Sequence, residues 1–369
     1  MFSRLKPKFS PFLRCISYKD FYIETYGCQM NVADTDLMKT ILMRAGYNLA
    51  STPTGAKTLL CNTCSIRQHA EDKVFNREKI LRATTHKQGL IGIVGCMAKK
   101  LTEEKCKQYG IDFVVSPDCY RELPQVIKYA SENCVLQMCV KSVNTECYDD
   151  IYPDCKYGNN PNSYISITRG CNNMCSYCIV PFAKGKERSR KATTIIEEYK
   201  QLINKEGTKQ ITLLGQNVNS YCDNSDPNKP VNFSELLETL ARYNPEIRIR
   251  FTSPHPKDFP LELLHVISKY NNICNHIHLP LQSGSNSVLK RMLRHYTIES
   301  YIELVNRIRS IIPNVGLTTD VIAGFCDETE EEFNDTLKAL KTIKFDYVTF
   351  TLNIGLHICL FYERTYASI

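Results

Sequence analysis

The chain has 369 residues, 43% of them hydrophobic, and a formal net charge of +7. This length predicts two or three domains, and the mild basic excess is compatible with an anionic partner. The eighteen cysteines are not spaced like a small secreted disulfide scaffold, and no apolar run is long enough for a membrane span. We therefore expect a reducing or cluster-assembling compartment and no membrane partner.

Residues 1–20 have the composition of an organellar transit peptide, because residues 1–19 hold three serines and no acidic residue. Their basic residues are Arg4, Lys6, Lys8, Arg14 and Lys19. Pro7 and Pro11 interrupt the amphipathic helix of such peptides, so the alternative is a short disordered leader. We expect a mitochondrial location, with a cytoplasmic location as the alternative.

Residues 21–133 alternate short apolar runs with helical periodicity, which predicts a small α/β domain with a parallel sheet. The expected strands are Phe21–Thr25, Thr58–Asn62, Leu90–Val94 and Asp112–Val115. The expected helices are Ala33–Ala45, Gln68–Arg82, Thr102–Gln108 and Leu123–Ala130.

Three cysteines of this domain, Cys28, Cys64 and Cys96, each follow the carboxyl end of a predicted strand. Because parallel strands end at one edge of their sheet, these thiols should converge there and form a three-thiolate site. Cys61 complicates this prediction, since its spacing from Cys64 also fits a redox pair or half of a zinc site. Cys61 lies inside the predicted strand, so we favour Cys64 as the ligand.

Residues 134–162 break the periodicity and are interpreted as a linker. Cysteines in or beside this linker are expected to be unpaired thiols. They are Cys134, Cys139, Cys147 and Cys155.

Residues 163–352 repeat strand then helix, which predicts an incomplete (β/α)6 barrel with its chemistry on the loops after the strands. The expected strands are Tyr164–Thr168, Gln210–Leu214, Arg248–Thr252, His276–Leu281, Leu317–Ile322 and Asp346–Thr351. The expected helices are Thr194–Lys205, Ser234–Tyr243, Leu261–Lys269, Tyr301–Ile311 and Glu330–Thr342.

The loop after the first of these strands places Cys171, Cys175 and Cys178 within eight residues. A closed zinc site needs a fourth ligand, and the next candidates, Cys222 and His255, lie far along the chain. Three cysteines on a four-iron cluster instead leave one iron open for catalysis. Structural zinc and ordinary reduced thiols remain the alternatives.

A run of basic side chains follows these cysteines and is opposed only by Glu187. Its members are Lys184, Lys186, Arg188, Arg190 and Lys191. Such a run is commonly a solvated face, but beside a reactive centre it is expected to contact nucleic-acid phosphates. The nearby His255, His276 and His278 are expected to be packed or hydrogen-bonded side chains.

The stretch RGCNNMCSYCIVPFAKGKERSR, with its Cys-x-x-x-Cys-x-x-Cys spacing, resembles the radical S-adenosylmethionine methylthiotransferases. With the motifs GCQMN, NTCSIR and GCM, it resembles the MiaB family over about Phe21 to Tyr347, and most closely the eukaryotic, partly mitochondrial branch. The resemblance implies methylthiolation of adenine C-2 in N6-isopentenyladenosine beside a tRNA anticodon.

The resemblance also implies the cofactors: S-adenosylmethionine and two [4Fe–4S] clusters, one on Cys171, Cys175 and Cys178 and an auxiliary one on the three amino-terminal cysteines. Residues expected to line the S-adenosylmethionine pocket, with a turn-forming role as the alternative for each, are Gly215, Gln216, Ser253, Gln282 and Gly324. The implied partners are the tRNA anticodon stem-loop and an electron donor, and the chain is expected to be a monomer.

Two departures from the family pattern stand out. Asp327 replaces a family glycine, and if that position has positive φ, Asp is tolerated at some cost. The match fades after Tyr347, so we expect residues 353–369 to be a divergent tail, the family's tRNA-binding TRAM domain to be absent and tRNA affinity to be reduced. The alternatives are a methylthiotransferase for another substrate and a catalytically weak iron–sulfur or kinase-regulatory binding protein, whose partner would be a kinase-activator protein.

Overall fold

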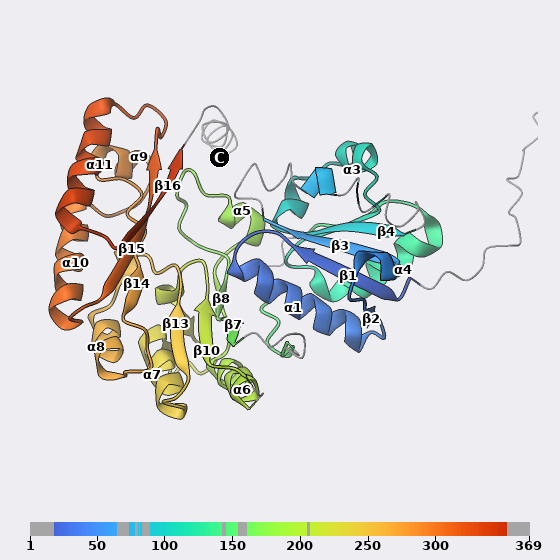
Figure 1. Cartoon of the computed structure of the whole chain (residues 1–369), viewed down its shortest axis with the longest axis horizontal. Coiled ribbons are helices and arrows are strands. Elements are labelled where there is room, and N and C mark those ends of the chain that lie inside the picture. Colours follow the sequence, from blue (N-terminus) through green and yellow to red (C-terminus); the bar gives the residue numbers. More distant parts are fainter. Residues whose placement is uncertain are drawn as a thin grey trace, which may run out of the picture.

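The computed structural model describes residues 18–64, 74–77, 80, 82, 89–141, 145–153, 161–204 and 207–352. Two lobes lie side by side, an amino-terminal sheet with its helices and a half-barrel (Figure 1). The predicted leader up to residue 17, most of the predicted helix Gln68–Arg82 and the predicted tail lie outside the described residues. Within the described ranges, no helix is long and apolar enough to cross a membrane.

The amino-terminal lobe is built on a six-stranded parallel sheet of order β2-β1-β3-β4-β5-β6. Its strands are β1 (Asp20–Thr25), β2 (Asn48–Leu49), β3 (Thr58–Thr63), β4 (Leu90–Gly95), β5 (Phe113–Val115) and β6 (Gln137–Cys139). The four predicted strands are confirmed as β1, β3, β4 and β5. The two edge strands, β2 and β6, were not predicted, because each is too short to show a pattern.

Helices cover both faces of this sheet. The helices are α1 (Gln29–Arg44), α3 (Glu103–Tyr109) and α4 (Leu123–Asn133), with 3-10 turns η1 (Pro53–Gly55), η2 (Cys96–Lys100) and η3 (Tyr120–Glu122). Side chains alternate along β3, so Leu60 packs with α1 and α4 while Leu59 and Cys61 pack on the α3 side. Both faces are therefore apolar, as expected for a covered parallel sheet.

The second lobe contains the predicted incomplete barrel, formed by two three-stranded parallel sheets. The strands are β7 (Asn162–Ser166), β10 (Gln210–Leu214), β13 (Arg248–Phe251), β14 (His276–His278), β15 (Gly316–Ala323) and β16 (Tyr347–Leu352). An isolated parallel bridge between Ile249 and Ile273 joins the sheets, so the six strands form one curved wall.

Outer helices follow these strands as predicted. They are α6 (Ala192–Ile203), α7 (Phe233–Tyr243), α8 (Leu261–Lys269), α10 (Ile298–Ile311) and α11 (Glu330–Ile343). Smaller helical elements that were not predicted are α5 (Val180–Lys184), α9 (Asn286–Arg291), η4 (Val218–Ser220) and η5 (Pro256–Asp258). Two short antiparallel strand pairs were not predicted either: β8 (Thr168–Arg169) with β9 (Arg188–Ser189), and β11 (Cys222–Asp223) with β12 (Val231–Asn232). Capping boxes begin α7, α10 and α11 and satisfy their first backbone N–H groups.

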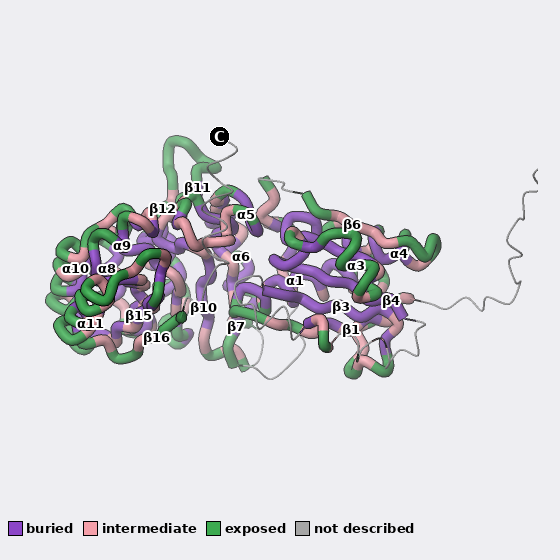
Figure 2. The backbone as a smooth tube through the Cα atoms, turned by 90° about the horizontal axis from the view of Figure 1, so that it is seen from above, coloured by how far each residue is buried: buried purple, intermediate pink, exposed green. Residues whose placement is uncertain are grey.

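The predicted linker differs from the structure in its described part. Strand β6 belongs to the amino-terminal sheet and lies beside α4 (Figure 2). Tyr148 and Ile151 are buried in the core beside α1 and α4. Burial of these side chains makes residues 145–153 a packed connection between the lobes. The sequence hid this because polar residues and prolines surround the two apolar anchors.

Candidate functional site

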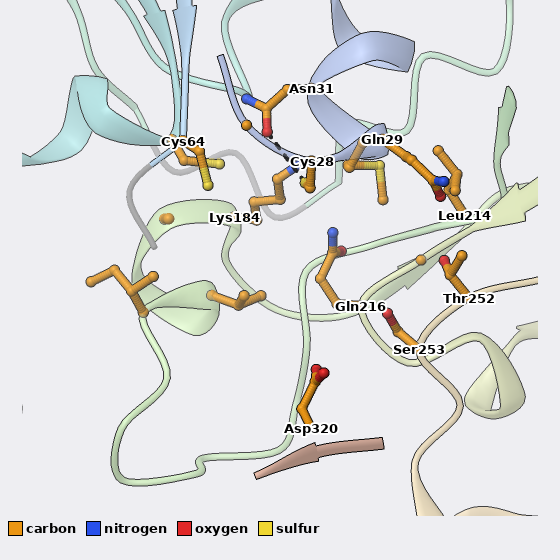
Figure 3. Close-up of a pocket in the computed structure, with 17 residues that line it drawn as sticks. Cys28, Gln29, Asn31, Cys64, Lys184, Leu214, Gln216, Thr252, Ser253 and Asp320 are labelled. Carbon is orange, nitrogen blue, oxygen red and sulfur yellow. Dashed lines mark hydrogen bonds between the residues drawn. The ribbon is translucent and has the colours of Figure 1, made fainter. Parts of the chain in front are cut away.

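A cavity of about 560 Å³ lies at the junction of the two lobes (Figure 3). The amino-terminal lobe contributes Gly27, Cys28, Gln29, Met30, Asn31, Cys64 and Cys96. The barrel contributes Ile179, Val180, Ala183, Lys184, Leu214, Gly215, Gln216, Thr252, Ser253 and Asp320. The cavity thus lies where the carboxyl ends of both sets of parallel strands meet, and its volume suits a small-molecule ligand.

The structure brings Cys28, Cys64 and Cys96 together at this cavity, although they follow three different strands. A hydrogen bond with Cys64 lowers the pKa of the Cys28 thiol to about 5, and the positive charge of Lys184 acts in the same direction. Burial raises the pKa of Cys96. The three cysteines thus line one cavity, as predicted, and their role as ligands of one cluster stays a prediction.

Two glycines allow this close approach. At Gly27, with φ of 136°, an added Cβ would lie 2.6 Å from the Cβ of Cys64. At Gly95, with φ of 93°, it would lie 2.5 Å from Oδ1 of Asn62. A side chain at either position would push the cysteine loops apart.

Cys61 has a different environment from Cys64. Its side chain is fully buried in the core beneath α3, whereas Cys64 lines the cavity. The location therefore agrees with the preference for Cys64, since successive residues of a strand point to opposite faces and Cys64 lies beyond the strand end.

The predicted S-adenosylmethionine residues divide into two sets. Gly215, Gln216 and Ser253 line the cavity, and Oε1 of Gln216 is buried without a hydrogen-bond partner among the described residues. A buried acceptor of this kind suits a polar ligand. Gln282 and Gly324 are not among the lining residues: the Gln282 backbone bonds to β15, and Gly324 N donates to the Glu328 carboxylate.

Cys171, Cys175 and Cys178 lie between β8 and α5, beside the cavity but not among its lining residues. Burial raises the pKa of Cys171 and raises that of Cys178 to about 12, and neighbouring cysteine charges contribute to both. The loop runs directly into Ile179 and Val180, which form part of the cavity wall.

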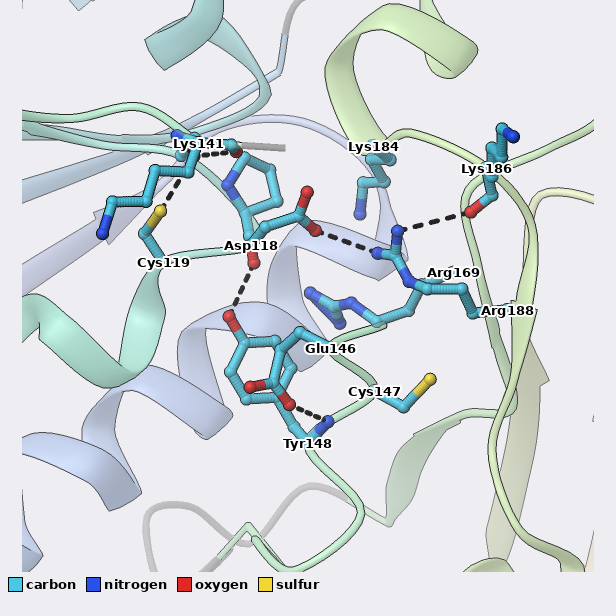
Figure 4. A network of polar contacts seen from close by, with 12 residues as sticks. Asp118, Cys119, Lys141, Glu146, Cys147, Tyr148, Arg169, Lys184, Lys186 and Arg188 are labelled. Carbon is cyan, nitrogen blue, oxygen red and sulfur yellow. Dashed lines mark hydrogen bonds and ion pairs between the residues drawn. The ribbon is translucent and has the colours of Figure 1, made fainter. Parts of the chain in front are cut away.

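Three of the five members of the basic run lie in a buried polar network, part of which Figure 4 shows, rather than on a free surface. Lys184 pairs with Asp34, Arg188 with Asp118, and Arg190 with Glu198. The expectation that these three cations contact tRNA is inconsistent with their burial and ion pairing, because their carboxylate partners compensate their charges inside the protein. Lys186 and Lys191 are exposed.

The network also holds the lobes together. Both Nη atoms of Arg169 donate to Oδ1 of Asp34 at 2.8 Å, and the Arg169 guanidinium lies 5.0 Å from the centre of the Tyr148 ring. Asp34 comes from α1 and Arg169 from β8. Sequence reasoning missed Asp34, because nothing local distinguishes it from an ordinary helix-surface acid.

The three histidines are packed or hydrogen-bonded, as expected. His278 contacts Thr318 at 2.9 Å and Asp320 at 3.2 Å, and His276 contacts the same threonine at 3.3 Å. Nδ1 of His255 accepts a hydrogen bond from the backbone N–H of Lys257, and burial lowers the pKa of His255 to about 3.

Helix α5 is a further element that the sequence analysis missed, although its signal is present. Pro181 lies in its first turn, and Gly185 ends it with φ of 74°. Proline at the start and glycine just past the end mark a helix even when it is short. This helix places Ala183 and Lys184 on the cavity wall.

The donor atoms fit iron–sulfur chemistry. Soft thiolates favour iron–sulfur clusters and zinc, and each triad offers three of them. Three protein ligands leave one metal position open, as catalysis requires.

Comparison with known proteins gives two family matches. Residues 165–340 match the radical SAM superfamily, and residues 20–116 match the uncharacterized protein family UPF0004. Among solved structures, the cobalamin-dependent S-adenosylmethionine radical enzyme OxsB has a TM-score of 0.58 at 11% identity, covering 95% of this chain and 56% of its own, which is a likeness of fold.

Curated relatives are more similar in sequence. The tRNA-2-methylthio-N(6)-dimethylallyladenosine synthase of Bacteroides fragilis is 44% identical over 330 residues, covering 89% of this chain and 72% of its own length. The human mitochondrial tRNA methylthiotransferase CDK5RAP1 is 42% identical, covering 88% of this chain and 61% of its own. With the radical SAM match and the convergent thiols, these similarities show that the chain belongs to the MiaB family of radical S-adenosylmethionine tRNA methylthiotransferases.

Proposed function

We propose that this chain methylthiolates C-2 of N6-isopentenyladenosine beside a tRNA anticodon, using S-adenosylmethionine and two [4Fe–4S] clusters. The observation that carries the proposal is the cavity at the lobe junction. Three thiols that follow the ends of β1, β3 and β4 line the same space as the loops after β10 and β13, and the loop of the second cysteine triad continues into the cavity wall. The names of the similar curated enzymes supply the substrate.

Each part of the site has a separate task in this proposal. Cys171, Cys175 and Cys178 hold the cluster that supplies radical chemistry with S-adenosylmethionine, and the amino-terminal triad holds the auxiliary, sulfur-supplying cluster. Gln216 offers its unpaired oxygen to a donor group of the bound cosubstrate. Apolar side chains of α5, including Val180 and Ala183, keep water from the space between the triads.

The proposed partners follow from the same site. The exposed Lys186 and Lys191 are the members of the basic run that remain suited to tRNA phosphates. An unstacked loop base is the form of adenine that such a cavity accepts. We further propose that the chain acts in the mitochondrion, which the name of the human relative supports. In this proposal it works as a monomer with a separate electron donor.

Iron and acid-labile sulfide measured after anaerobic reconstitution test the cluster assignment. The parent should hold about eight irons, and the Cys171→Ala/Cys175→Ala/Cys178→Ala variant about four. The Cys28→Ala/Cys64→Ala/Cys96→Ala variant should also hold about four, while Cys61→Ala should match the parent. Four or fewer irons in the parent, unchanged in either triple variant, would contradict two clusters.

The substrate assignment is tested separately with reduced, reconstituted protein. Transcribed tRNA that already carries the N6-isopentenyl group should gain a 2-methylthio group when it is incubated with the parent protein, but not with either triple cysteine variant. Mass spectrometry of the tRNA nucleosides detects the product. Identical tRNA without the isopentenyl group is the control. Methylthiolation of the control alone, or cleavage of S-adenosylmethionine without any modified adenosine, would refute this substrate.

A further inference from the structure

Arg294 is a buried cation directly beside the second cysteine triad. Only 5% of its surface is exposed, and its Nη1 lies 3.5 Å from Sγ of Cys175. Its Nη2 donates to the Pro280 carbonyl at 3.1 Å, and its Nε donates to the Tyr296 hydroxyl at 3.1 Å. All three guanidinium nitrogens therefore donate a hydrogen bond, and one of these bonds goes to a thiol.

The charge of Arg294 has no carboxylate partner in the described part of the chain, where its three hydrogen bonds go to a thiol, a carbonyl and a phenol. Most other buried cations of the junction, such as Arg169 and Arg188, pair with aspartates. A buried charge is costly unless an anion compensates it. Among the described groups that hydrogen-bond to Arg294, the thiol of Cys175 is the one that becomes anionic when it binds a metal.

The backbone around Arg294 fixes this geometry. Its neighbours Leu293 and His295 have φ of 56° and 48°, a conformation that residues with a Cβ seldom adopt. The backbone N–H of Arg294 donates to Leu289 O at 3.0 Å, which anchors the turn to α9. Such strained turns persist where the surrounding structure requires a particular side-chain direction.

The same turn is tied to the cysteine loop at a second point. The Ser176 backbone N–H donates to Met292 O at 3.2 Å, and the Ser176 hydroxyl donates to Arg291 O at 2.9 Å. Ser176 is adjacent to Cys175 in the chain, so the hydrogen bonds hold the sulfur and the guanidinium in one rigid unit. The Tyr296 ring, 5.1 Å from the guanidinium carbon, supports the other face.

We propose that Arg294 is a positioning residue that stabilises the Cys175 thiolate and raises the reduction potential of the cluster held by Cys171, Cys175 and Cys178. Reduction adds one electron from the external donor and makes the cluster one unit more negative, with no bond or proton change. A hydrogen bond from a cation to a cluster sulfur stabilises the more negative state, so reduction becomes easier. The inference rests on the cluster assignment of the proposed function.

Potentiometric titration of the reconstituted protein, followed by electron paramagnetic resonance, tests this role. The cluster in question is identified as the one whose signal changes when S-adenosylmethionine is added. In Arg294→Met, the ratio of reduced to oxidised cluster at a fixed potential should fall at least tenfold, which is 59 mV for one electron. Arg294→Lys keeps the charge but not the forked geometry of the guanidinium, so the ratio of reduced to oxidised cluster should fall less in this variant.

Arg291→Met is the matched control, because Arg291 is three residues earlier and pairs with Glu332 instead of a cysteine. Its cluster should stay within twofold of the parent ratio. Arg294→Met within twofold of the parent would overturn the proposal, even if its melting temperature falls. If Arg294→Met holds no iron, Arg294→Lys decides, and an unchanged ratio in that variant overturns the proposal. Absence of both clusters in the parent would instead refute the proposed function.

Discussion

Replacing Asp34 with asparagine removes the one negative charge that two buried cations share. The Asp34 side chain is 2% exposed and binds Arg169 at 2.8 Å and Lys184 at 3.3 Å, whose own side chains are 3% and 6% exposed. It also accepts a hydrogen bond from the Tyr120 hydroxyl at 3.3 Å. An asparagine side chain has the same shape but no charge. It faces the two cations either with its amide N–H₂, which repels them, or with its carbonyl oxygen, which is a weaker acceptor than a carboxylate.

The size of the effect follows from Coulomb's law. With charge centres about 4 Å apart and an effective dielectric constant of about 20, each pair contributes about 4 kcal/mol. Burying the Asp34 carboxylate costs desolvation free energy, which the Asp34→Asn variant avoids. This cost offsets part of the favourable Coulomb energy of the two ion pairs. Breaking a buried pair by removing one partner costs about 3–5 kcal/mol, which we expect for Asp34→Asn. This is a large share of a typical total stability of about 5–15 kcal/mol.

Anaerobic urea unfolding of Asp34→Asn measures the loss, and Asp36→Asn is the control. Asp36 lies on the same helix and pairs with Lys39 at the surface, where such pairs contribute about 0–1 kcal/mol. The free energy of unfolding should therefore fall several-fold more in Asp34→Asn. Equal losses in the two variants would refute the argument that the buried network joins the lobes.

Three further predictions concern single groups. In cluster-free protein, Cys28 should be alkylated with half-maximal rate near pH 5 and Cys96 only above its ordinary pKa, as peptide mass spectrometry would show; equal profiles would contradict the opposite pKa shifts. The pKa of His255 in the folded protein, about 3, is below that of an exposed histidine. As the pH is lowered below about 6.5, the unfolded chain therefore takes up a proton that the folded protein does not, and the free energy of unfolding decreases. Between pH 7 and 5.5 the free energy of unfolding of the parent should fall by about 1 kcal/mol more than that of His255→Gln, and equal slopes would argue against a neutral buried His255. Asp327→Gly should raise stability by about 0.5–1 kcal/mol, because relief of the left-handed conformation exceeds the entropy cost of glycine, whereas Asp327→Ala should not. Thermal unfolding compares these two variants, and a less stable glycine variant would contradict the strain.

The periodic parts of the fold could be predicted from the sequence. Strands such as Gln210–Leu214 and helices such as Leu261–Lys269 match within a residue, because apolar spacing and flanking turn residues specify them locally. The convergence of Cys28, Cys64 and Cys96 was also predictable, since the carboxyl ends of parallel strands meet at one edge. Asp327 has φ of 57°, so the condition under which Asp is tolerated at some cost is met.

What could not be predicted depends on residues far apart in the chain. The basic run resembled a free surface, and only its partners reveal otherwise: Asp34 and Arg169 are 135 residues apart, and Asp118 and Arg188 are 70. Charge patterns in one sequence do not contain such pairings. Likewise, strand ends indicated that loop residues gather, but not that Gln282 would bond to β15 instead of lining the cavity.

Helix α1 acts as a spacer of fixed phase between the lobes. It begins at the Cys28 cap and carries Asp34 on its second turn, so one rigid element sets both the cavity thiol and the contact with the barrel. One extra residue between them would rotate Asp34 by about 100° around the helix axis, away from Arg169. The number of residues between Cys28 and Asp34 therefore cannot change by even one, whereas surface loops tolerate insertions with little free-energy cost.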